Sequence, residues 1–359
     1  MKIDEELECP KVDIIILNWN GWKDTIECLE SINRITYTNY DIIIVDNGSE
    51  NESIEMIREY CNGRVAVNSK LVPEIEGRNN KPIEILEYER EELESEGHKL
   101  DDSEKIRNNK LIIIKNEKNY GFAEGNNIAI RYALKSLNPD YLLLLNNDTV
   151  VDREFLDYAI NAAMSDKKIG IVGPKIYYYD FNGRTDIINF AGGRLDMWKG
   201  RSYHIGEDEI DVGQYDKIKI VDFVEGSAFL VKKDALREIG LIDPIYFAYW
   251  EEVDFCMRAF KAGYELIYVP ESKVWHKISS SVEDRFKIYY ISRNRFLFLN
   301  KYSTRNQYLS FLIYFFAYQL WFLSFLYLFY KRDPRLFKCF IRGTIDGILI
   351  TDNKPKHRH

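Results

Sequence analysis

The stretch YLLLLNNDTVV, residues 141–151, determines how this chain is expected to fold. Its first part is apolar, and it leads directly into Asn146, Asn147 and Asp148. A short apolar run that ends in polar residues predicts a strand buried on both faces of a parallel sheet. Ligands of open α/β sheets bind just beyond the carboxyl ends of the strands, so this strand would present Asp148 at the ligand-binding edge.

Asp148 has two interpretations. A carboxylate at the edge of a sheet can hold a hard divalent cation, and that cation can hold a diphosphate. The alternative is that residues 146–148 form only a turn, because Asn and Asp favour turns in any protein. The rest of the chain favours the first interpretation.

Length and composition limit the class of protein. The 359 residues suffice for one large domain or two, and 46% of them are hydrophobic, enough for a sizeable core. The net charge of −8 argues against a nucleic-acid partner. The cysteines form no CxxC pair, which argues for a reducing compartment and against a disulfide framework or a zinc site. Residues 1–11 are acidic and lack an apolar run, so no signal peptide is expected.

Two earlier segments repeat the pattern of residues 141–151. The apolar run 13–17 ends at Asn18, and the run 41–45 ends at Asp46. A helix is predicted after each run, which gives the order β-α-β-α. This order is typical of a doubly wound α/β sheet that binds a nucleotide.

A third apolar run, residues 111–115, leads into the glycine-containing segment 119–127. Gly121 and Gly125 allow tight backbone turns and the close approach of a ligand. Residues 64–110, which precede this run, are dense in charge and are predicted to form a solvated surface insertion. A partner-binding role for this insertion is the alternative.

The second half of the chain contains further candidate site residues. A strand–turn–strand pattern is centred on Gly226, and a last predicted strand leads to His276. Glu251, Glu252 and Asp254 lie at the start of a predicted helix, near its positive N-terminal end. The alternative interpretations are an ordinary acidic helix start and a packed histidine.

Several motifs in a fixed order carry a family resemblance. They are Asn18-Trp-Asn-Gly21, Val45-Asp-Asn-Gly-Ser49, Asn119-Tyr-Gly-Phe-Ala-Glu-Gly-Asn-Asn127, Leu145-Asn-Asn-Asp-Thr149, Glu225-Gly-Ser227, Phe247-Ala-Tyr-Trp-Glu-Glu-Val-Asp254 and Trp275-His276. Over about residues 11–300 the chain resembles the family-2 glycosyltransferases, and particularly their rhamnosyltransferase-like members. The resemblance implies a GT-A type doubly wound mixed sheet, with a nucleotide-binding half and an acceptor half.

The resemblance also implies roles for the nucleotide-sugar site. Asp46 would recognise the base, and residues lining the site would be Asn18, Gly121, Asn126, Asn127, Asn146, Asn147, Asp148 and Gly226. The Asn-Asn-Asp motif stands where the family has its DxD-like metal motif, so Asp148 would be the main carboxylate on the cation. His276 would be the second contact to the metal or the diphosphate.

The catalytic position is matched with one departure. Glu252 stands where the family has the Asp of a Glu-Asp pair, which acts as the general base. Glu252 is the longer side chain, so Glu251 stays the alternative base.

The implied reaction is an inverting, metal-dependent transfer of a sugar, with rhamnose suggested, from a nucleotide-diphosphate sugar. The acceptor would be a glycan or a polyprenyl-linked molecule of cell-envelope polysaccharide synthesis. Mg²⁺ or Mn²⁺ would neutralise the leaving diphosphate, and a His ligand favours Mn²⁺ slightly. One alternative is a sugar-1-phosphate nucleotidyltransferase, although residues 18–22 lack its Gly-rich loop with Arg and Lys. The other is a non-catalytic membrane scaffold that binds a sugar nucleotide.

A membrane-associated helical region, residues 301–359, is expected after the GT-A domain of residues 1–300. The 23 residues 308–330 carry no charge and would form a helix of about 34 Å, close to the thickness of a bilayer core. Their tyrosines, Trp321 and Gln319 prefer the interface, and basic residues flank both ends, which opposes a single span. The segment is therefore expected to lie on the cytoplasmic face of the cell membrane, or to dip in and return. The alternative is a helix packed on the catalytic domain or in a homodimer.

Overall fold

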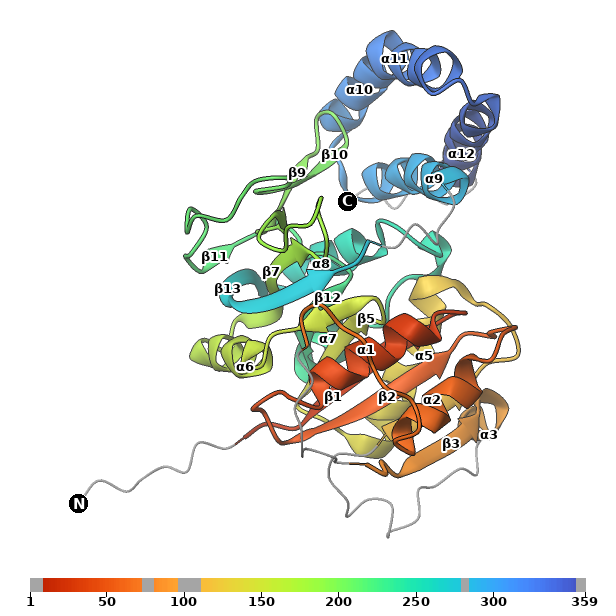
Figure 1. The fold of residues 1–359 in the computed structure, drawn as a ribbon. Helices are drawn as coiled ribbons and strands as arrows, with labels where there is room; N and C mark the ends of the chain where they lie inside the picture. The colour runs from red at the N-terminus through yellow and green to blue at the C-terminus, as the bar shows by residue number, and fades with distance from the viewer. Residues whose placement is uncertain (1–8, 73–80, 96–110, 279–283, 353–359) are drawn as a thin grey trace, which may run out of the picture.

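The computed structural model describes residues 9–72, 81–95, 111–278 and 284–352. They form a mixed sheet with helices on both faces, and helices stand at one end of the molecule (Figure 1). The strands are β1 (Val12–Asn18), β2 (Tyr40–Asp46), β3 (Ile85–Glu89), β4 (Leu111–Lys115), β5 (Tyr141–Asn146), β6 (Thr149–Val151), β7 (Ile169–Tyr178), β8 (Ile188–Phe190), β9 (Gly193–Asp196), β10 (Arg201–His204), β11 (Lys219–Ile220), β12 (Ala228–Lys232) and β13 (Glu265–His276).

The main helices are α1 (Trp22–Ile32), α2 (Ser53–Cys61), α3 (Arg90–Glu94), α5 (Gly121–Tyr132), α6 (Phe155–Ser165), α7 (Lys233–Ile239), α8 (Glu251–Lys261), α9 (Asp284–Tyr302), α10 (Arg305–Tyr314), α11 (Leu320–Phe325) and α12 (Pro334–Asp352). Shorter helical turns are η1 (Ala133–Leu137), η2 (Pro244–Tyr246), η3 (Phe315–Gln319) and η4 (Leu326–Tyr330). Along the sheet the strand order is β11-β13-β7-β12-β5-β1-β2-β4-β3, with β6 paired to β13 and β8 to β7.

The strand predicted from residues 141–151 is β5, in the interior of the sheet. It pairs in parallel with β1, and β1 pairs in parallel with β2. In this register Asn18 lies opposite Asp46, and Leu17 lies opposite Asn146. The polar residues that end these strands therefore meet at one edge, and the predicted mixed α/β sheet is confirmed.

The second half of the sheet carries the antiparallel pairs. β12 runs antiparallel to β5, and β6 runs antiparallel to the end of β13, where Thr149 lies opposite His276. This pairing brings the segment that follows β5 against the end of β13. The two regions that contain Asp148 and His276 thus become neighbours through the sheet.

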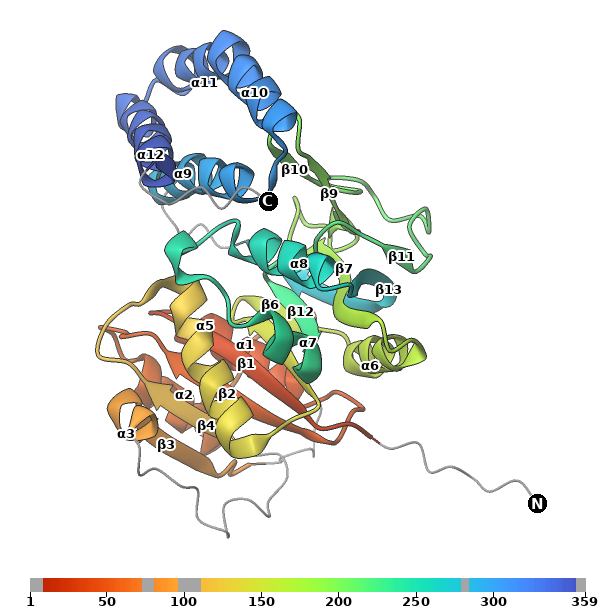
Figure 2. The same cartoon turned by 180° about the vertical axis from the view of Figure 1, so that it is seen from behind.

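Burial on both faces explains why these strands are continuous apolar runs. In β1, Ile15 belongs to the core on the side of α5, whereas Ile14 and Ile16 belong to the core on the side of α1, α2 and α6. All three side chains are fully buried. Figure 2 shows α5, α7 and α8 on the face opposite α1 and α2.

The structure differs from the sequence prediction at two places in the first half. Part of the predicted insertion, β3, pairs in parallel with β4 and forms an edge of the main sheet. Its short alternating sequence Ile85-Leu-Glu-Tyr-Glu89 suits an edge strand, which needs fewer buried side chains than an interior one. The helix α5 begins at Gly121, so Gly125 lies within a helix instead of a loop, with Leu17 packed against it.

Several expectations lie outside the described residues. They concern segments 73–80 and 96–110 of the predicted insertion, residues 1–8, where no signal peptide was expected, and residues 353–359 of the tail.

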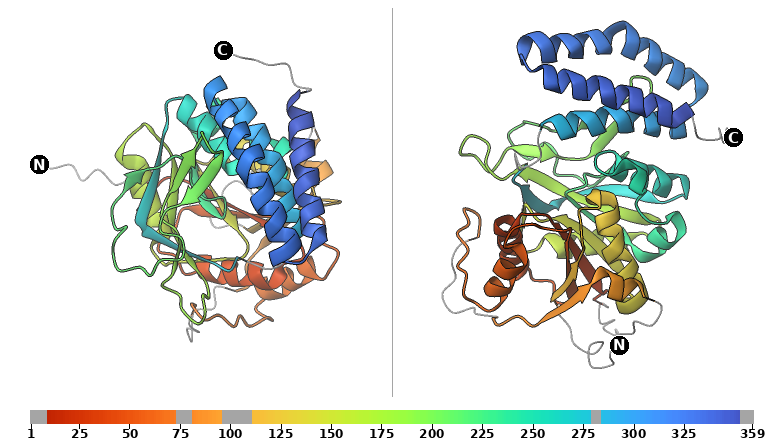
Figure 3. Two further views of the ribbon diagram at one scale, coloured as in Figure 1. Left: turned by 90° about the horizontal axis from the view of Figure 1, so that it is seen from above. Right: turned by 90° about the vertical axis from the view of Figure 1, so that its right-hand side faces the viewer.

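The helices α9 to α12, residues 284–352, form what is called here the helical cap, which stands beyond the sheet and its covering helices (Figure 3). In the described chain, the continuous helix Arg305–Tyr330 is long and apolar enough to cross a membrane, with a mean hydropathy of 1.7 and only 17% of its apolar window buried. The chain then reverses, and α12 packs along α9. Close packing is set by Gly343 and Gly347, whose Cβ atoms would meet the carbonyl oxygens of Tyr289 and Arg293.

Candidate active site

The ends of β1 and β2 form the first part of the site. The Asn18 amide donates to Asp46 Oδ1 at 2.7 Å, and the Ser49 hydroxyl donates to the same oxygen at 2.6 Å. The Ser49 backbone N–H donates to Asp46 Oδ2 at 3.0 Å. Asn18 and Asp46 are both buried. The structure therefore brings these two predicted residues together and orients the Asp46 carboxylate with donors from its own loop.

The Asn146-Asn147-Asp148 motif is both a turn and part of the site. Asn147 and Asp148 form the turn between β5 and β6, so the two interpretations of this motif are compatible. The Asn147 amide donates to Thr25 Oγ1 on α1 at 3.1 Å. The Asn146 backbone N–H donates to the Ser227 carbonyl at 2.7 Å. These contacts anchor the turn and leave Asp148 directed towards β13.

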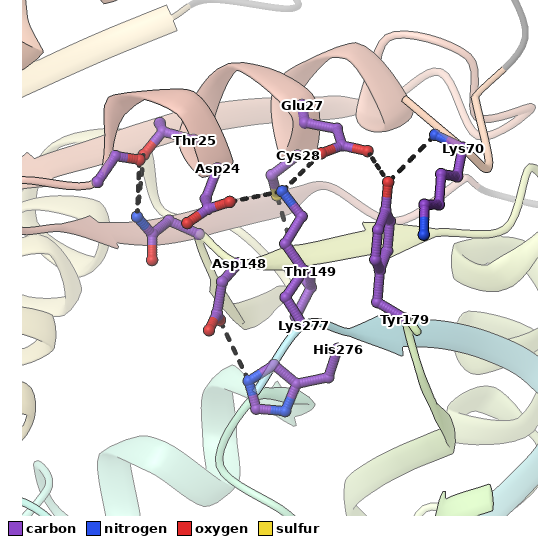
Figure 4. Close-up of polar contacts among 12 residues, drawn as sticks. Asp24, Thr25, Glu27, Cys28, Lys70, Asp148, Thr149, Tyr179, His276 and Lys277 are labelled. Carbon is purple, nitrogen blue, oxygen red and sulfur yellow. Dashed lines mark hydrogen bonds and ion pairs between the residues drawn. The ribbon is translucent and has the colours of Figure 1, made fainter. Parts of the chain in front are cut away.

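Asp148 and His276 form a buried pair at the centre of the site (Figure 4). Asp148 Oδ1 lies 3.1 Å from His276 Nε2, and each side chain is 12% exposed. Burial alone would lower the pKa of His276, but the Asp148 charge and hydrogen bond outweigh it and raise this pKa to about 9. The other ring nitrogen, His276 Nδ1, has no hydrogen-bond partner among the described residues.

Lys277 connects the end of β13 to Asp148 and to α1. Its backbone N–H donates to the Asp148 carbonyl at 2.9 Å. Its ammonium group lies 2.5 Å from carboxylate oxygens of both Asp24 and Glu27 on α1 (Figure 4). Because Lys277 follows His276 directly, these contacts fix the histidine relative to the nucleotide-binding half of the sheet.

Glu251 and Glu252 form the first turn of α8. Burial raises the pKa of Glu252 to about 7, helped by the charge of Glu225, while backbone N–H groups of the turn act in the opposite direction. Burial, followed by the charge of Glu252, raises the pKa of Glu251 well above its usual range. The Oε2 atoms of both residues are buried without a hydrogen-bond partner among the described residues. Glu252 can therefore take up a proton near neutral pH.

The segment Glu225-Gly226-Ser227 connects the acid pair to the Asp148–His276 pair. A Cβ atom on Gly226 would lie 3.6 Å from Glu252 Cβ, so this backbone lies directly against the acid. The charge of Glu225 raises the pKa of both Glu252 and His276. Burial and then the charges of Glu251, Glu252 and Asp148 raise the pKa of Tyr249 to about 12.

Asp254, the third acid of the helix start, has a structural role. It is fully buried, and its carboxylate accepts from Lys301 Nζ at 2.7 Å and from Arg258 Nε at 2.9 Å. The structure thus separates Asp254 from Glu251 and Glu252, although the three lie within one turn of sequence.

The residues at the start of α5 lie in a tightly packed corner. Gly121 has a φ of +81°, and a Cβ atom there would lie 2.6 Å from the Phe247 ring, so this position requires glycine. The amide of Asn126 donates to the Phe122 carbonyl at 2.9 Å, and that of Asn127 donates to the Ile242 carbonyl at 2.8 Å. No hydrogen bond of the described structure joins either amide to Asp46 or Asp148, so their nucleotide-binding role stays a prediction.

Several residues of the site were not among the predicted ones. They are Ser49, Glu225, Tyr249 and Lys277. Glu225 and Lys277 adjoin predicted residues in the chain, a signal that was available. Ser49 lies three residues after Asp46 and contacts it within one loop, so a local signal was available there as well. The effect of Asp148 on Tyr249 depends on packing between segments that are distant in sequence.

Two protein-family profiles match the chain. The profile described as glycosyl transferase family group 2 matches residues 141–341, and the profile of glycosyl transferase family 2 matches residues 13–78. The first match alone covers more than half of the chain. It contains β5, the acid pair and His276.

Curated relatives include three sugar transferases. The chain is 29% identical over 190 residues to the low-salt glycan biosynthesis hexosyltransferase Agl10 of Haloferax volcanii, covering 51% of this chain and 58% of that protein. It is 25% identical over 213 residues to the dTDP-rhamnosyl transferase RfbF of Shigella flexneri, covering 56% and 66%. A shorter match, 41% identical over 56 residues, covers 16% of this chain and 18% of an N-acetylglucosaminyl-diphospho-decaprenol L-rhamnosyltransferase of Mycobacterium tuberculosis. At least a third of each relative lies outside the matched region.

Solved structures share the fold. The mannosyltransferase PcManGT from Pyrobaculum calidifontis, in complex with GDP-Man and Mn²⁺, matches with a TM-score of 0.54 at 12% identity, over 96% of this chain and 88% of that one. GalNAc-T7 with UDP, GalNAc and Mn²⁺ matches with a TM-score of 0.53 at 18% identity, over 81% and 51%. The fold is thus of the GT-A type, and together with the family profiles this shows that the chain belongs to the family-2 glycosyltransferases, with rhamnosyltransferase-like relatives.

Proposed function

We propose that this protein is an inverting, metal-dependent glycosyltransferase that moves a sugar from a nucleotide-diphosphate sugar to a hydroxyl group of a glycan or lipid-linked acceptor. The observation that carries the proposal is that two pairs, Asp148–His276 and Glu251–Glu252, both lie close to the segment 225–227. Gly226 lies against Glu252, and the charge of Glu225 acts on both Glu252 and His276. The first pair would hold the cation that binds the diphosphate of the donor, and the second pair would take the proton of the acceptor hydroxyl.

Glu252 is the proposed general base. Its carboxylate takes the proton of the acceptor hydroxyl while the hydroxyl oxygen bonds to the anomeric carbon of the donor. The bond between that carbon and the diphosphate oxygen breaks on the opposite face, which inverts the anomeric configuration. A pKa of about 7 suits this role, because the group is then basic enough to take the proton and is about half ionised at neutral pH.

The residues present fit a divalent cation of the Mg²⁺ or Mn²⁺ type. Asp148 supplies a carboxylate oxygen and His276 an imidazole nitrogen 3.1 Å away, a mixed donor set that leans towards Mn²⁺. Within the described residues no cluster of three or more His, Cys, Asp or Glu side chains suits a metal, so the donor diphosphate would complete the coordination. The cation, when bound, neutralises the leaving diphosphate. The Mn²⁺ in two structural neighbours supports the assignment.

The names of the relatives suggest the substrates. One relative uses dTDP-rhamnose by its name, and another acts on a diphospho-decaprenol carrier. We therefore take dTDP-rhamnose as the first donor to test and a diphospho-polyprenol sugar as the first acceptor. Base recognition is assigned to Asp46, with Asn18, Gly121, Asn126 and Asn127 around it.

The proposed location is the cytoplasmic face of the cell membrane. Along Arg305–Tyr330 large apolar side chains are exposed, including Trp321 at 68% and Phe329 at 64%. After this helix the chain returns, and α12 packs on α9, which precedes the helix in the chain. This return supports a segment that lies in the membrane surface or dips in and returns. The exposed basic residues of the following segment are Lys331, Arg332, Arg335, Lys338 and Arg342, which suit anionic headgroups.

The test is the release of nucleoside diphosphate by the full-length protein in detergent with Mn²⁺. A panel of dTDP-, UDP- and GDP-sugars is offered with and without a diphospho-polyprenol N-acetylglucosamine acceptor. We expect acceptor-dependent release with one donor class, and a product whose anomeric configuration is opposite to that of the donor by NMR. A protein that binds a donor but transfers no sugar to any acceptor would instead be a binding scaffold.

A further inference from the structure

The loop that leads into the acid pair has an unusual backbone. Phe247, Tyr249 and Trp250 have φ angles of +63°, +64° and +74°, in the left-handed region that bulky residues rarely adopt. Strained residues of this kind persist only where the surroundings hold them, and they cluster at functional sites. Trp250 immediately precedes Glu251, so the conformation of this loop sets the direction in which α8 begins.

One side chain of α9 holds this loop. The amide nitrogen of Asn294 lies within donor distance of three loop carbonyls, those of Tyr246 at 2.8 Å, Ala248 at 2.8 Å and Tyr249 at 2.7 Å. Asn294 is fully buried. Its own carbonyl oxygen accepts from Arg293 Nε at 2.9 Å, and Arg293 also donates to the Ile245 carbonyl. The amide is therefore committed to the backbone of this one loop.

The loop of residues 247–250 also packs against α9 through aromatic rings, without the Asn294 amide. Phe247 stacks on Tyr290, with ring centroids 5.2 Å apart, and Trp250 packs against Phe298 at 5.1 Å. These ring contacts would hold many loop conformations against the helix. A donor that reaches three convergent carbonyls selects the one conformation in which those carbonyls point at the same spot.

We propose that Asn294 is a positioning residue for glycosyl transfer, which holds the strained loop of residues 247–250 so that Glu252 faces the reacting hydroxyl. The proposal rests on the proposed function, because it assigns Glu252 as the base. In this arrangement α8 starts with Glu252 against Gly226. Without the three contacts, the loop relaxes towards ordinary φ angles, and the first turn of α8 moves away from the segment 225–227.

The first test replaces Asn294. Asn294→Leu keeps the approximate size and removes the donor, and Asn294→Asp keeps the shape but faces the carbonyls with an acceptor. We expect kcat to fall about 10- to 100-fold in each variant, as for a misplacement of about 1 Å, while KM for the donor stays within about twofold. Thr344→Val is the matched control, because it removes one buried hydrogen bond in the same helical cap, from Thr344 Oγ1 to the Phe340 carbonyl at 2.9 Å. It should leave kcat unchanged.

A rescue experiment separates positioning from a general loss of structure. Tyr249→Gly and Tyr249→Ala both remove the ring, but only glycine adopts a φ of +64° without strain. In the Asn294→Leu background the glycine variant should be several-fold faster than the alanine variant, whereas the two should be nearly equal in the wild-type background. Equal rates in both backgrounds, or wild-type kcat in Asn294→Leu and Asn294→Asp, would overturn the proposal.

A measurement without turnover keeps the two proposals distinct. The Glu252 carboxyl can be titrated by NMR in protein labelled at glutamate Cδ, with Glu252→Gln identifying its signal. In Asn294→Asp or Asn294→Leu we expect the pKa of Glu252 to fall from about 7 towards its usual 4.5, because the acid loses its buried position. An unchanged titration would contradict the role of Asn294, even if no acceptor is ever found. Absence of transfer by the wild type, with a shifted titration in the variants, would instead contradict only the proposed function.

Discussion

His276 Nε2 lies 3.1 Å from Asp148 Oδ1, and the backbone N–H of Lys277, the residue after β13, donates to the Asp148 carbonyl at 2.9 Å. Asp148 is thus held through its side chain by the last residue of β13 and through its main chain by the residue that follows. The antiparallel pairing of β6 with β13 produces this relationship, because it aligns Thr149 with His276. The proposed cation site therefore depends on the register of two short strand segments.

Removal of the Asp148 carboxylate should weaken donor binding that depends on Mn²⁺. We expect Asp148→Ala to lower the affinity for dTDP-rhamnose, or for whichever donor the panel identifies, by about 10-fold or more in the presence of Mn²⁺. His276→Ala should have a smaller effect, because the charged ligand is kept. Isothermal calorimetry with and without a chelator measures both, and an Asp148→Ala variant with unchanged affinity in both conditions would disprove the metal assignment.

Substitution of the proposed base should affect turnover and spare donor binding. Glu252→Gln is expected to lower kcat by about 10²-fold or more, since the amide cannot take the proton of the acceptor. Steady-state kinetics and donor calorimetry on the same preparation separate the two effects. Glu251→Gln is the matched comparison, and full activity in Glu252→Gln with loss in Glu251→Gln would move the base by one residue.

The wild-type rate should also depend on pH in a defined direction. The base acts in its ionised form, and its pKa is about 7, so kcat should decrease as the pH falls below about 7. Circular dichroism at each pH controls for unfolding. A rate that stays constant down to pH 5 would show that no group with this pKa acts as the base.

The buried acid should also make stability pH-dependent. A pKa raised from 4.5 to about 7 on folding means that Glu252 favours the folded state fully below about pH 4.5, and that this contribution is lost as the pH rises through about 7. Glu252→Gln removes this loss. The Tm of Glu252→Gln minus that of the wild type should therefore be larger at pH 8 than at pH 5, by on the order of 5 °C. Thermal melts at the two pH values measure this change. A difference in Tm that is constant with pH would mean that Glu252 titrates near its usual value.

The exposed face of the helix Arg305–Tyr330 should bind a membrane. A triple variant, Trp321→Glu, Phe325→Glu and Phe329→Glu, places charge on side chains that are 68%, 61% and 64% exposed. We expect this variant to lose at least about 10-fold of its binding to phosphatidylglycerol vesicles in a flotation assay, because charge on this face opposes insertion.

The control and the topology test complete the membrane prediction. Val212→Glu and Ile218→Glu change exposed apolar side chains near β11 and should leave vesicle binding unchanged. A protease-sensitive tag after residue 359 should be cleaved only from the cytoplasmic side in sealed vesicles. Cleavage only from the opposite side would establish a true span, and full-length protein that never binds vesicles would remove the membrane from the proposal.

The parallel part of the fold could be predicted from local sequence patterns. Four short apolar runs predict strands that are covered on both faces, and all four are strands of the sheet. They are residues 13–17, 41–45, 111–115 and 141–145. Parallel strands end at the same edge, so the meeting of Asn18 with Asp46 followed from the pattern alone. The predicted acidic helix start is also found, since Glu251, Glu252 and Asp254 lie in the first turn of α8.

Long-range packing, in contrast, sets which of these polar residues face one another. β3 carries too little apolar sequence to be recognised as a strand, and it joins the sheet because β4 offers it an open edge. Glu252 and Asp254 are close in sequence, yet one lies against Gly226 and the other pairs with Lys301 and Arg258, since helical periodicity turns them to different sides. The Asp148–His276 and Asn294–loop contacts join segments far apart in the chain, and long-range contacts of this kind arise from packing, which no local pattern encodes.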